Sequence, residues 1–468
     1  MRRSRAPLSV ARGLARPVQM LLLAVGLLAG CASAPAPHLS SLVYRIEATE
    51  TRLSVEIEAQ GAKPARWYLV GESNLRVASG EQRATVKGGV LRLPAEHLSY
   101  AYSLKSRLQR SQSLERGAGV PGSFVVRGDR YLLVPRPGIL LPETRVELRF
   151  KGLEPFLPWP CVREGEEWVA RLYANDLRQL GFHAFGARRR IPLQLEEGAR
   201  WEVVLLAGDL LASDERIERW IQEAAQEAAR LGAGSPRERV AIVLVPTPSG
   251  EPAPFGRVLY SEPRSAAIYV GQRAPERSFA GDWLATHELM HTLHPRFDGQ
   301  PRWLSEGIAA YYQCLAPIRS GRERPEVLWR VLAQGVATGQ TEALGRSLQE
   351  VAKAMHTLPA YSAVYWGGAL LALEVDLEIR RATEGKRGLE HVLAALRPRG
   401  SVTLREFGRS VDALAGVAIW EQIRRAHLEG QALRRAKPLL RGLGIGPGGA
   451  LDSKAPGAKW RLRLERGS

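Results

Sequence analysis

Two histidines and two glutamates in the second half of the chain have the spacing of a catalytic metal site. His287 and His291 lie four residues apart in the segment His-Glu-Leu-Met-His, so on a helix both imidazoles face the same metal ion. Glu288 lies beside them, where its carboxylate is free to act as a base. Glu306 follows in the segment Trp-Leu-Ser-Glu-Gly and offers a third ligand. The pattern predicts one zinc ion per chain, held by His287, His291 and Glu306.

The segments around these residues are predicted to be buried helices. Apolar residues surround the first motif on nearly all sides, with Asp282 as N-cap and Pro295 as helix stop. Buried histidines and carboxylates need partners, and a metal ion satisfies them together. With three protein ligands, a fourth position remains for a metal-activated water that Glu288 helps to deliver. Two alternatives remain open. The first motif is a chance match, or Glu306 is not a ligand but a residue in the first turn of a helix, where the helix dipole favours a negative charge.

The combination of motifs resembles the gluzincin metallopeptidases, and most closely their glycyl aminopeptidase family. The resemblance rests on the two segments above and on residues 365–370, Tyr-Trp-Gly-Gly-Ala-Leu, which resemble the family's Tyr-x-Lys-Gly-Ala-Leu. It implies that Tyr365 donates a hydrogen bond to the oxyanion of the tetrahedral intermediate. On spacing alone, Tyr365 is equally well explained as a core aromatic residue, and Tyr361 is a weaker candidate for the same role.

Three features depart from the family pattern. Gly367 stands in place of the family lysine. In the family, a glutamate on the strand before the zinc helix holds the free amine of the substrate, whereas here Glu262 is one place out of register. A slip of one residue turns a strand side chain to the opposite face, so the choice between exo- and endopeptidase action stays open. The chain after the helical region is too short for the family's PDZ domain, which is therefore not expected.

His294 extends the first motif to His-Glu-x-x-His-x-x-His. Metzincins need a glycine three places and a histidine six places after the second ligand, and those places hold His294 and Phe297. The metzincin pattern is therefore excluded. We predict that His294 is a polar residue at the helix end, where the helix dipole favours it.

The N-terminus predicts export as a bacterial lipoprotein. Several arginines precede an apolar run from Met20 to Ala29, which is too short to span a bilayer as a mature helix. Leu-Ala-Gly-Cys at residues 28–31 resembles a lipobox, so residues 1–30 are predicted as a signal peptide and Cys31 as a lipid anchor. By analogy with enterobacterial sorting, the protein is expected at the outer membrane, facing the periplasm. The alternative is an ordinary signal cleaved within residues 32–34.

The remaining cysteines, Cys161 and Cys314, form either a disulfide or two separate buried thiols. The chain has 66 basic and 48 acidic residues, a net charge of +18. Its arginine runs at residues 188–190 and 434–435 are typical of solvated surface, or else contact an acidic envelope polymer. Nucleic-acid binding is disfavoured, because the chain is predicted to be exported and has no recognisable module.

The overall pattern predicts an α+β multidomain protein. After a tether at residues 31–42, alternating apolar and polar residues at 43–200 predict an antiparallel β-sandwich. Residues 201–320 are predicted as a thermolysin-like α/β zinc catalytic domain, with a helix from Asp214 capped by Ser213, and strands at 240–245 and 266–270. The second of these strands precedes the zinc helix, and the resemblance to gluzincins implies that it is an edge strand that pairs with the substrate backbone. A helical domain at 321–440 and a glycine-rich basic tail at 441–468 complete the prediction.

The function predicted is a zinc-dependent peptidase of the cell envelope that acts on peptides or proteins, with Glu288 as general base. The alternative is a non-catalytic envelope lipoprotein that retains the gluzincin fold and binds a protein or polymer partner. Retention of Glu288 favours the enzyme, because a binding protein needs no base. The altered amine-binding strand and the missing lysine favour the alternative. The sequence indicates neither the natural substrate nor an oligomeric state.

Overall fold

The computed structural model describes residues 38–467, except for 72–73, 111–112, 115, 137, 196–199, 232–238 and 356. The predicted signal peptide, the predicted lipidation residue Cys31 and the tether up to residue 37 lie outside the described residues. Among the helices of the described ranges, none combines the length and the apolar character needed to cross a membrane.

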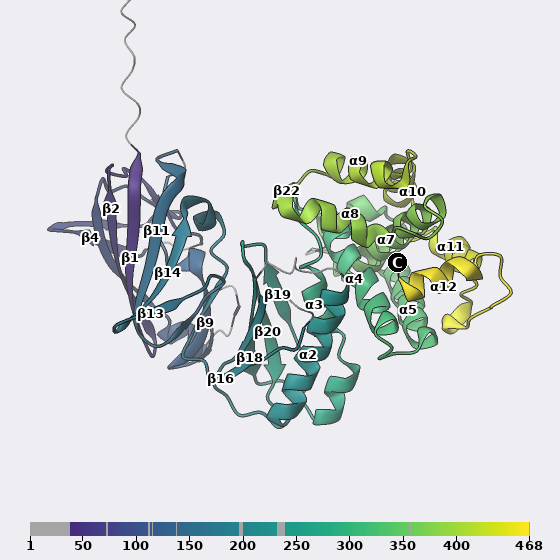
Figure 1. The fold of residues 1–468 in the computed structure, drawn as a ribbon, viewed down its shortest axis with the longest axis horizontal. Coiled ribbons are helices and arrows are strands. Elements are labelled where there is room, and N and C mark those ends of the chain that lie inside the picture. The colour runs from purple at the N-terminus through teal and green to yellow at the C-terminus, as the bar shows by residue number, and fades with distance from the viewer. Residues whose placement is uncertain are drawn as a thin grey trace, which may run out of the picture. The chain divides into compact units, whose positions relative to one another are not determined.

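The N-terminal part is built around an eight-stranded sheet (Figure 1). Buried residues alternate with more exposed ones along its strands, so one face of the sheet covers a core that includes Tyr44 and Tyr100. The hydroxyl of Tyr44 donates to the Leu133 carbonyl at 2.8 Å. The strands, in sheet order, are β13 (Val162–Glu164), β14 (Glu167–Tyr173), β11 (Leu140–Gly152), β1 (Leu39–Thr49), β2 (Arg52–Gln60), β7 (His97–Ser103), β4 (Arg76–Ser79) and β5 (Gln82–Thr85).

The prediction that this part is purely antiparallel is wrong at one pair of strands. β1 runs parallel to β11, with Leu42 opposite Val146. A short turn joins β1 to β2, which makes that pair antiparallel. A long segment of chain lies between β1 and β11, and such a connection permits parallel pairing. Two smaller sheets and a short helix complete this part: β10 (Val134–Pro135), β3 (Trp67–Tyr68) and β6 (Val90–Leu91); β12 (Pro155–Phe156), β15 (Phe182–Phe185), β9 (Ser123–Arg127) and β8 (Ala118–Val120); and α1 (Lys105–Arg110).

A five-stranded sheet lies at the centre of the region that the sequence predicts to be catalytic. Its central strand is buried on both faces: Ile242 and Leu244 face α2 (Asp214–Arg230), whereas Val243 and Val245 belong to a core shared with the small sheet of β8, β9, β12 and β15. The α2 helix begins as predicted, since the Ser213 hydroxyl accepts from the Arg216 amide. In sheet order the strands are β16 (Arg189–Ile191), β17 (Arg200–Leu205), β18 (Arg239–Thr247), β20 (Arg264–Gly271) and β19 (Gly256–Leu259).

The order of this sheet corrects one prediction. The strand expected at residues 266–270 corresponds to β20, which lies between β18 and β19 and is therefore not an edge strand. The edge is β19, whose sequence at 256–259 is too short to show a periodic signal. A turn of a few residues returns the chain from β19 into β20, which makes these two strands antiparallel.

The rest of the chain is mainly helical, and one continuous core extends from the five-stranded sheet into it (Figure 1). The boundary predicted at residue 320 therefore falls within a single core. The predicted tail is folded, because the Trp329 indole donates to Glu465 at 2.8 Å and Leu464 is fully buried. The elements are α3 (Leu284–Met290), β21 (Arg296–Phe297), α4 (Arg302–Arg319), α5 (Pro325–Ala343), α6 (Leu348–Ala354), α7 (Tyr361–Ala382), α8 (Leu389–Leu396), β22 (Ser401–Val402), α9 (Leu404–Ala415), α10 (Trp420–Leu428), α11 (Ala436–Gly442) and α12 (Ala458–Arg466).

A buried carboxylate joins the helices of this region. Glu374 on α7 accepts from the His427 ring at 2.7 Å and from Arg435 at 2.9 Å. Burial acts to raise the pKa of Glu374, but these two partners outweigh it and lower the pKa to about 2. Glu374 is therefore ionised at neutral pH and contributes to stability there.

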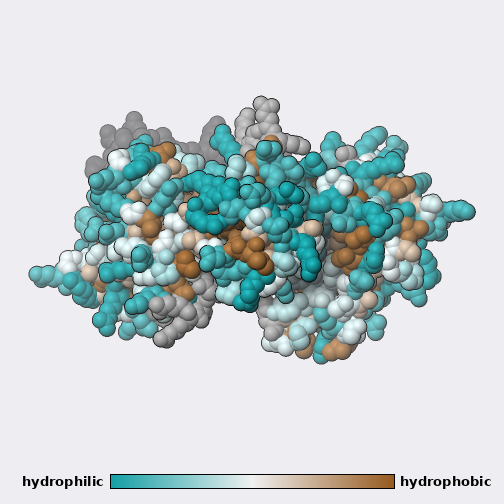
Figure 2. Space-filling view, turned by 90° about the horizontal axis from the view of Figure 1, so that it is seen from below, coloured by the Kyte–Doolittle hydropathy of each residue, from teal (hydrophilic) through white to brown (hydrophobic). Residues whose placement is uncertain are grey.

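Most charged groups of the predicted basic runs have acidic partners. Arg189 pairs with Asp214 at 2.9 Å and Arg190 with Glu154 at 2.8 Å. Figure 2 shows a face on which hydrophilic residues predominate and hydrophobic residues form small, separate patches. The two cysteines that the structure describes, Cys161 and Cys314, are free thiols and pack in different cores, as expected for two separate thiols.

Candidate metal centre

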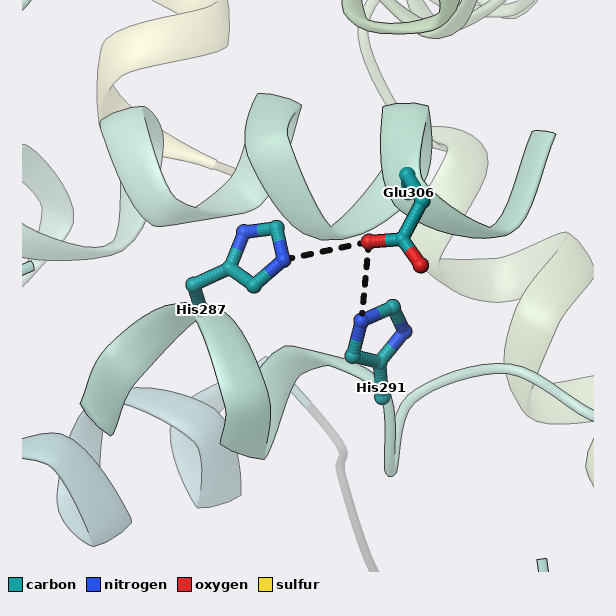
Figure 3. A group of neighbouring side chains, drawn as sticks. All are labelled: His287, His291 and Glu306. Atoms are coloured by element: carbon teal, nitrogen blue, oxygen red, sulfur yellow. Dashed lines mark hydrogen bonds and ion pairs between the residues drawn. The ribbon is translucent and has the colours of Figure 1, made fainter. Parts of the chain in front are cut away.

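The structure brings the three predicted ligands together where α3 and α4 meet (Figure 3). His287 lies on α3, His291 directly follows its last turn, and Glu306 lies in the first turns of α4. The Oε2 atom of Glu306 is 3.3 Å from His287 Nε2 and 3.4 Å from His291 Nε2. In a tetrahedral site with bonds of about 2.1 Å, two ligand atoms lie about 3.4 Å apart. The two distances from Glu306 to the histidines therefore suit a zinc ion, and all three ligand atoms lie within 4.8 Å of one another.

The electrostatics of Glu306 suit a cation. Burial acts to raise the pKa of Glu306, but the nearby His291 and His287 outweigh it and hold the pKa well below its usual range. The carboxylate is therefore ionised in a largely buried position. Two imidazole nitrogens and one carboxylate oxygen are the ligand set of many catalytic zinc sites.

The ring of His287 is oriented by an amide from α4. Its Nδ1 atom is 2.6 Å from Gln313 Oε1, which can only accept a hydrogen bond. Nδ1 therefore carries a proton, which leaves Nε2, the nitrogen that faces Glu306, as the atom that would bind a metal ion. Gln313 was not predicted from the sequence, although it lies two helical turns after Glu306 and hence on the same face of α4.

The ring of His291 is oriented by a second histidine. His294 is fully buried, and its Nδ1 atom donates to the Pro295 carbonyl at 2.8 Å. Its Nε2 atom is therefore an acceptor, 3.2 Å from Nδ1 of His291, which leaves Nε2 of His291 for the metal. Burial, reinforced by His291, holds the pKa of His294 well below its usual range, so the ring is neutral. We had predicted a polar residue at the helix end; the structure instead places His294 behind a ligand.

Two hydroxyl groups complete the surroundings of these histidines. The hydroxyls of Tyr260 and Ser305 are 3.1 Å apart, and both lie 3.4 Å from Nε2 of His294. Tyr260 follows β19 and Ser305 precedes Glu306 on α4, so they connect the edge of the sheet to the ligand helix. Ser305 lies within the second motif, but the sequence does not indicate its contact with Tyr260, because that contact depends on tertiary packing.

The predicted base, Glu288, lies on α3 against the edge strand β19. Its closest neighbour there is Gly256, where an added Cβ atom would lie only 2.5 Å from Cγ of Glu288. Burial raises the pKa of Glu288 to about 7; His287 opposes this shift, and the negative charge of Glu306 adds to it. A carboxylate with a pKa near neutrality is suited to accept and return a proton at physiological pH.

Tyr365 also reaches the metal centre. Its ring, on α7, stacks on His287 with centroids 5.6 Å apart and an interplanar angle of 13°. Burial, the charges of Glu306 and Glu288, and a hydrogen bond with Glu306 all raise the pKa of Tyr365, so its hydroxyl stays protonated. Tyr361, one turn earlier, is 47% exposed. Of the two tyrosines, Tyr365 therefore presents a hydroxyl donor beside the ligands.

Two glycines allow the helices that carry Glu306 and Tyr365 to cross closely. A Cβ atom added at Gly307 on α4 would lie 2.3 Å from the backbone of Gly368 on α7. This contact explains why the third motif has a glycine at position 368, since a larger residue there would separate the two helices. At Gly367 an added Cβ atom would lie 2.8 Å from the Cδ1 atom of Leu348, so the lysine of the family pattern would require that side chain to shift.

Glu262 lies apart from this group. It is exposed in the turn between β19 and β20, and its backbone carbonyl accepts from the Trp159 indole at 3.1 Å. Its Oε1 atom would lie 2.8 Å from a Cβ atom added at Gly400, so the carboxylate is directed to the loop after α8. The structure thus brings together His287, Glu288, His291, Glu306 and Tyr365, but not Glu262.

No family model and no curated protein matches the sequence. Among solved structures, the chain is similar to an aminopeptidase N family protein from Idiomarina loihiensis, with a TM-score of 0.64 at 14% identity over 86% of this chain and 78% of that chain. It also matches an M1 zinc metallopeptidase from Deinococcus radiodurans, with a TM-score of 0.48 at 15% identity over 84% of this chain and 94% of that one. The first likeness shows that the chain has the multidomain α/β fold of that aminopeptidase N family protein.

Proposed function

We propose that this protein is a zinc-dependent peptidase that hydrolyses peptide bonds, with Glu288 as its general base. The observation that carries the proposal is the ligand geometry: both histidine Nε2 atoms lie 3.3–3.4 Å from one carboxylate oxygen of Glu306. The fold supports it, since the similar structure is an aminopeptidase N family protein. A binding protein has no need of a carboxylate base next to its metal ligands.

Each residue has a defined task in this mechanism. When bound, zinc supplies a Lewis acid that polarises the peptide carbonyl and makes water more acidic. Glu288 accepts a proton from the attacking water and returns it to the leaving amine. Tyr365 donates a hydrogen bond to the oxyanion that forms at the attacked carbonyl. His287, His291 and Glu306 would hold the metal.

The test compares two substitutions at the site with a matched substitution elsewhere. Glu288→Gln removes the base but no ligand, so hydrolysis of a peptide mixture should fall at least 100-fold with zinc content unchanged. Glu306→Ala removes a ligand, so zinc content should fall as well. Glu215→Gln, on the exposed side of α2, is the control and should change neither quantity. Mass spectrometry of the products also locates the cut bonds.

The outcomes separate the enzyme from its alternative. Undiminished hydrolysis by the Glu288→Gln protein would contradict the mechanism. If the native protein binds zinc stoichiometrically but cuts no peptide of a diverse mixture, the proposal of a peptidase fails, and a binding protein with the same fold is the better description.

We also propose that the protein is lipidated at Cys31 and faces the periplasm from the outer membrane. The lipobox at residues 28–31 supports this location. Cys31→Ser should move the protein from the membrane fraction to the soluble fraction of cells. A Cys31→Ser protein that stays in the membrane fraction would refute the lipid anchor.

A further inference from the structure

A pocket of about 630 Å³ is lined by Trp283, Gln313 and Tyr365, the residues that surround the ring of His287. Three of its lining residues contact the ligand His287. The Trp283 ring meets it edge to face at 5.7 Å, Tyr365 stacks on it, and Gln313 accepts its hydrogen bond. Tyr365 lines the pocket and also has a hydrogen bond with Glu306, so this side chain connects the pocket to the metal position.

The walls of the pocket come from helices that also build the metal centre. One wall is α4, which carries Glu306, and another is α7, which carries Tyr365. The third is α5, and the segment before α3 closes the pocket near Trp283. Apolar and aromatic side chains dominate the lining: Trp283, Val327, Leu328, Val331, Tyr361 and Trp366.

The polar groups of the lining are mostly engaged within the protein. Arg322 forms an ion pair with Glu227 at 2.7 Å and donates to the Ala280 carbonyl. Asp282 accepts from the Trp220 indole at 2.9 Å and from the Ala285 amide at 3.1 Å. The paired groups offer little to a charged ligand, which would lose its hydration on entering.

The apolar groups of the lining, in contrast, are uncovered. Trp283 is 52% exposed, Tyr361 47% and Val331 36%, which are high values for large apolar residues. Exposed apolar side chains around a concave pocket are typical of a ligand-binding site. Its volume exceeds what a glycine or alanine residue can fill.

We propose that this pocket binds a large apolar side chain, aromatic or branched aliphatic, of the substrate residue next to the cleaved bond. The proposal rests on the proposed function, because it takes the ligand to be a peptide positioned at the metal centre. A phenylalanine or leucine side chain covers the exposed walls and excludes water. A charged side chain loses its hydration on entering, aspartate finds Arg322 already paired with Glu227, and glycine leaves the walls exposed.

The first experiment measures binding without turnover. The Glu288→Gln protein, loaded with zinc, is titrated calorimetrically with two series of peptides. In one series the residue before the bond cut by the native enzyme varies, and in the other series the residue after it varies. If the native enzyme cuts no bond, the central bond of the peptide takes its place. The residue is glycine, alanine, leucine, phenylalanine, aspartate or lysine. In one of the two series, we expect leucine and phenylalanine to bind about 10- to 100-fold more tightly than glycine, with aspartate and lysine weakest. Equal affinities in both series would overturn the proposal.

A substitution in the pocket then assigns the preference. Val331→Arg places a cation among the apolar walls and should abolish the preference for phenylalanine over glycine, and raise the affinity for aspartate. Val417→Arg is the matched control, because Val417 is a valine that is 54% exposed and does not line the pocket. Equal unfolding midpoints of the two variants exclude misfolding. An unchanged preference in the Val331→Arg protein would refute this site.

The outcomes for the pocket and for the peptidase are distinguishable. If apolar peptides bind preferentially but the native protein cuts none of them, the pocket stands and the proposed function fails. If the native protein hydrolyses all peptides of both series with equal kcat/KM and binds them equally, the peptidase stands and the pocket proposal fails.

Discussion

Replacing Gly368 by alanine tests whether the close crossing of α4 and α7 holds the metal centre together. An added Cβ atom would lie 1.8 Å from the Trp303 carbonyl oxygen and 2.8 Å from Cα of Gly307. The first distance is about 1.6 Å short of ordinary contact, and both neighbours are backbone atoms, which cannot rotate away. The two helices must therefore move apart by more than 1 Å, or bend.

The movement acts on the residues that the two helices carry. Glu306 directly precedes Gly307 on α4, and Tyr365 lies one turn before Gly368 on α7. Metal sites tolerate changes of only about 0.2 Å in ligand distances, so a displacement of this size weakens the site. We expect the Kd for zinc to rise about 10- to 100-fold. The free energy of unfolding should fall by about 1–3 kcal/mol, as for other overpacked cores.

Chelator competition measures the zinc Kd, and denaturant unfolding of the zinc-free protein measures stability. Gly442→Ala is the matched control, because Gly442 ends helix α11 and an added Cβ atom meets nothing within 4 Å. That variant should keep its zinc affinity and be as stable as the native protein, or more stable by up to about 1 kcal/mol. If Gly368→Ala behaves like Gly442→Ala in both measurements, the reasoning about the helix crossing is wrong.

Three further predictions concern other contacts. Replacing His294 by phenylalanine removes the hydrogen-bond acceptor of the ligand His291, so zinc affinity measured by chelator competition should fall about 10-fold. Glutamine at position 294 should restore part of this affinity. If phenylalanine and glutamine lower the zinc affinity equally, His294 does not position the ligand. Gly256→Ala should displace Glu288 and lower kcat at least 10-fold with zinc content unchanged, whereas unchanged kcat would show that the base tolerates the shift. Because the folded-state pKa of Glu374 is depressed, its carboxylate stabilises the fold above about pH 4.5, and this contribution declines toward pH 2. Glu374→Gln should therefore be less stable by about 1–3 kcal/mol at pH 7, and urea unfolding at pH 7, 4 and 3 should show the difference shrinking.

The residues of the metal centre were the most predictable part of the molecule. His287 and His291 face the same side because a helix repeats every 3.6 residues, which is a local property of the sequence. The segment with Glu306 has the apolar spacing of a helix, and α4 indeed covers it. Local periodicity likewise located α2, β18 and β20. These predictions need no knowledge of which distant segments are in contact.

The features that were missed depend on contacts between distant segments. β1 pairs with β11 across about a hundred residues, and periodicity within a strand does not specify its partner or direction. The folded tail depends on Glu465, which accepts from Trp329 on α5. The sequence predicts His294 only as a polar residue at a helix end, since its acceptor role emerges only once the chain turns after α3 and buries it. Its position three residues after a ligand was the one available signal.

The same two helices build both the metal centre and the pocket, which couples zinc affinity to substrate preference. α4 contributes Glu306 and one pocket wall, and α7 contributes Tyr365 and another. Separating them at Gly368 should therefore weaken zinc binding and also reduce the preference for apolar peptides. Gly256→Ala acts from β19, which does not line the pocket, and should lower kcat while leaving zinc affinity and preference unchanged. A Gly368→Ala protein with weakened zinc binding but an intact preference would show that the two properties are independent.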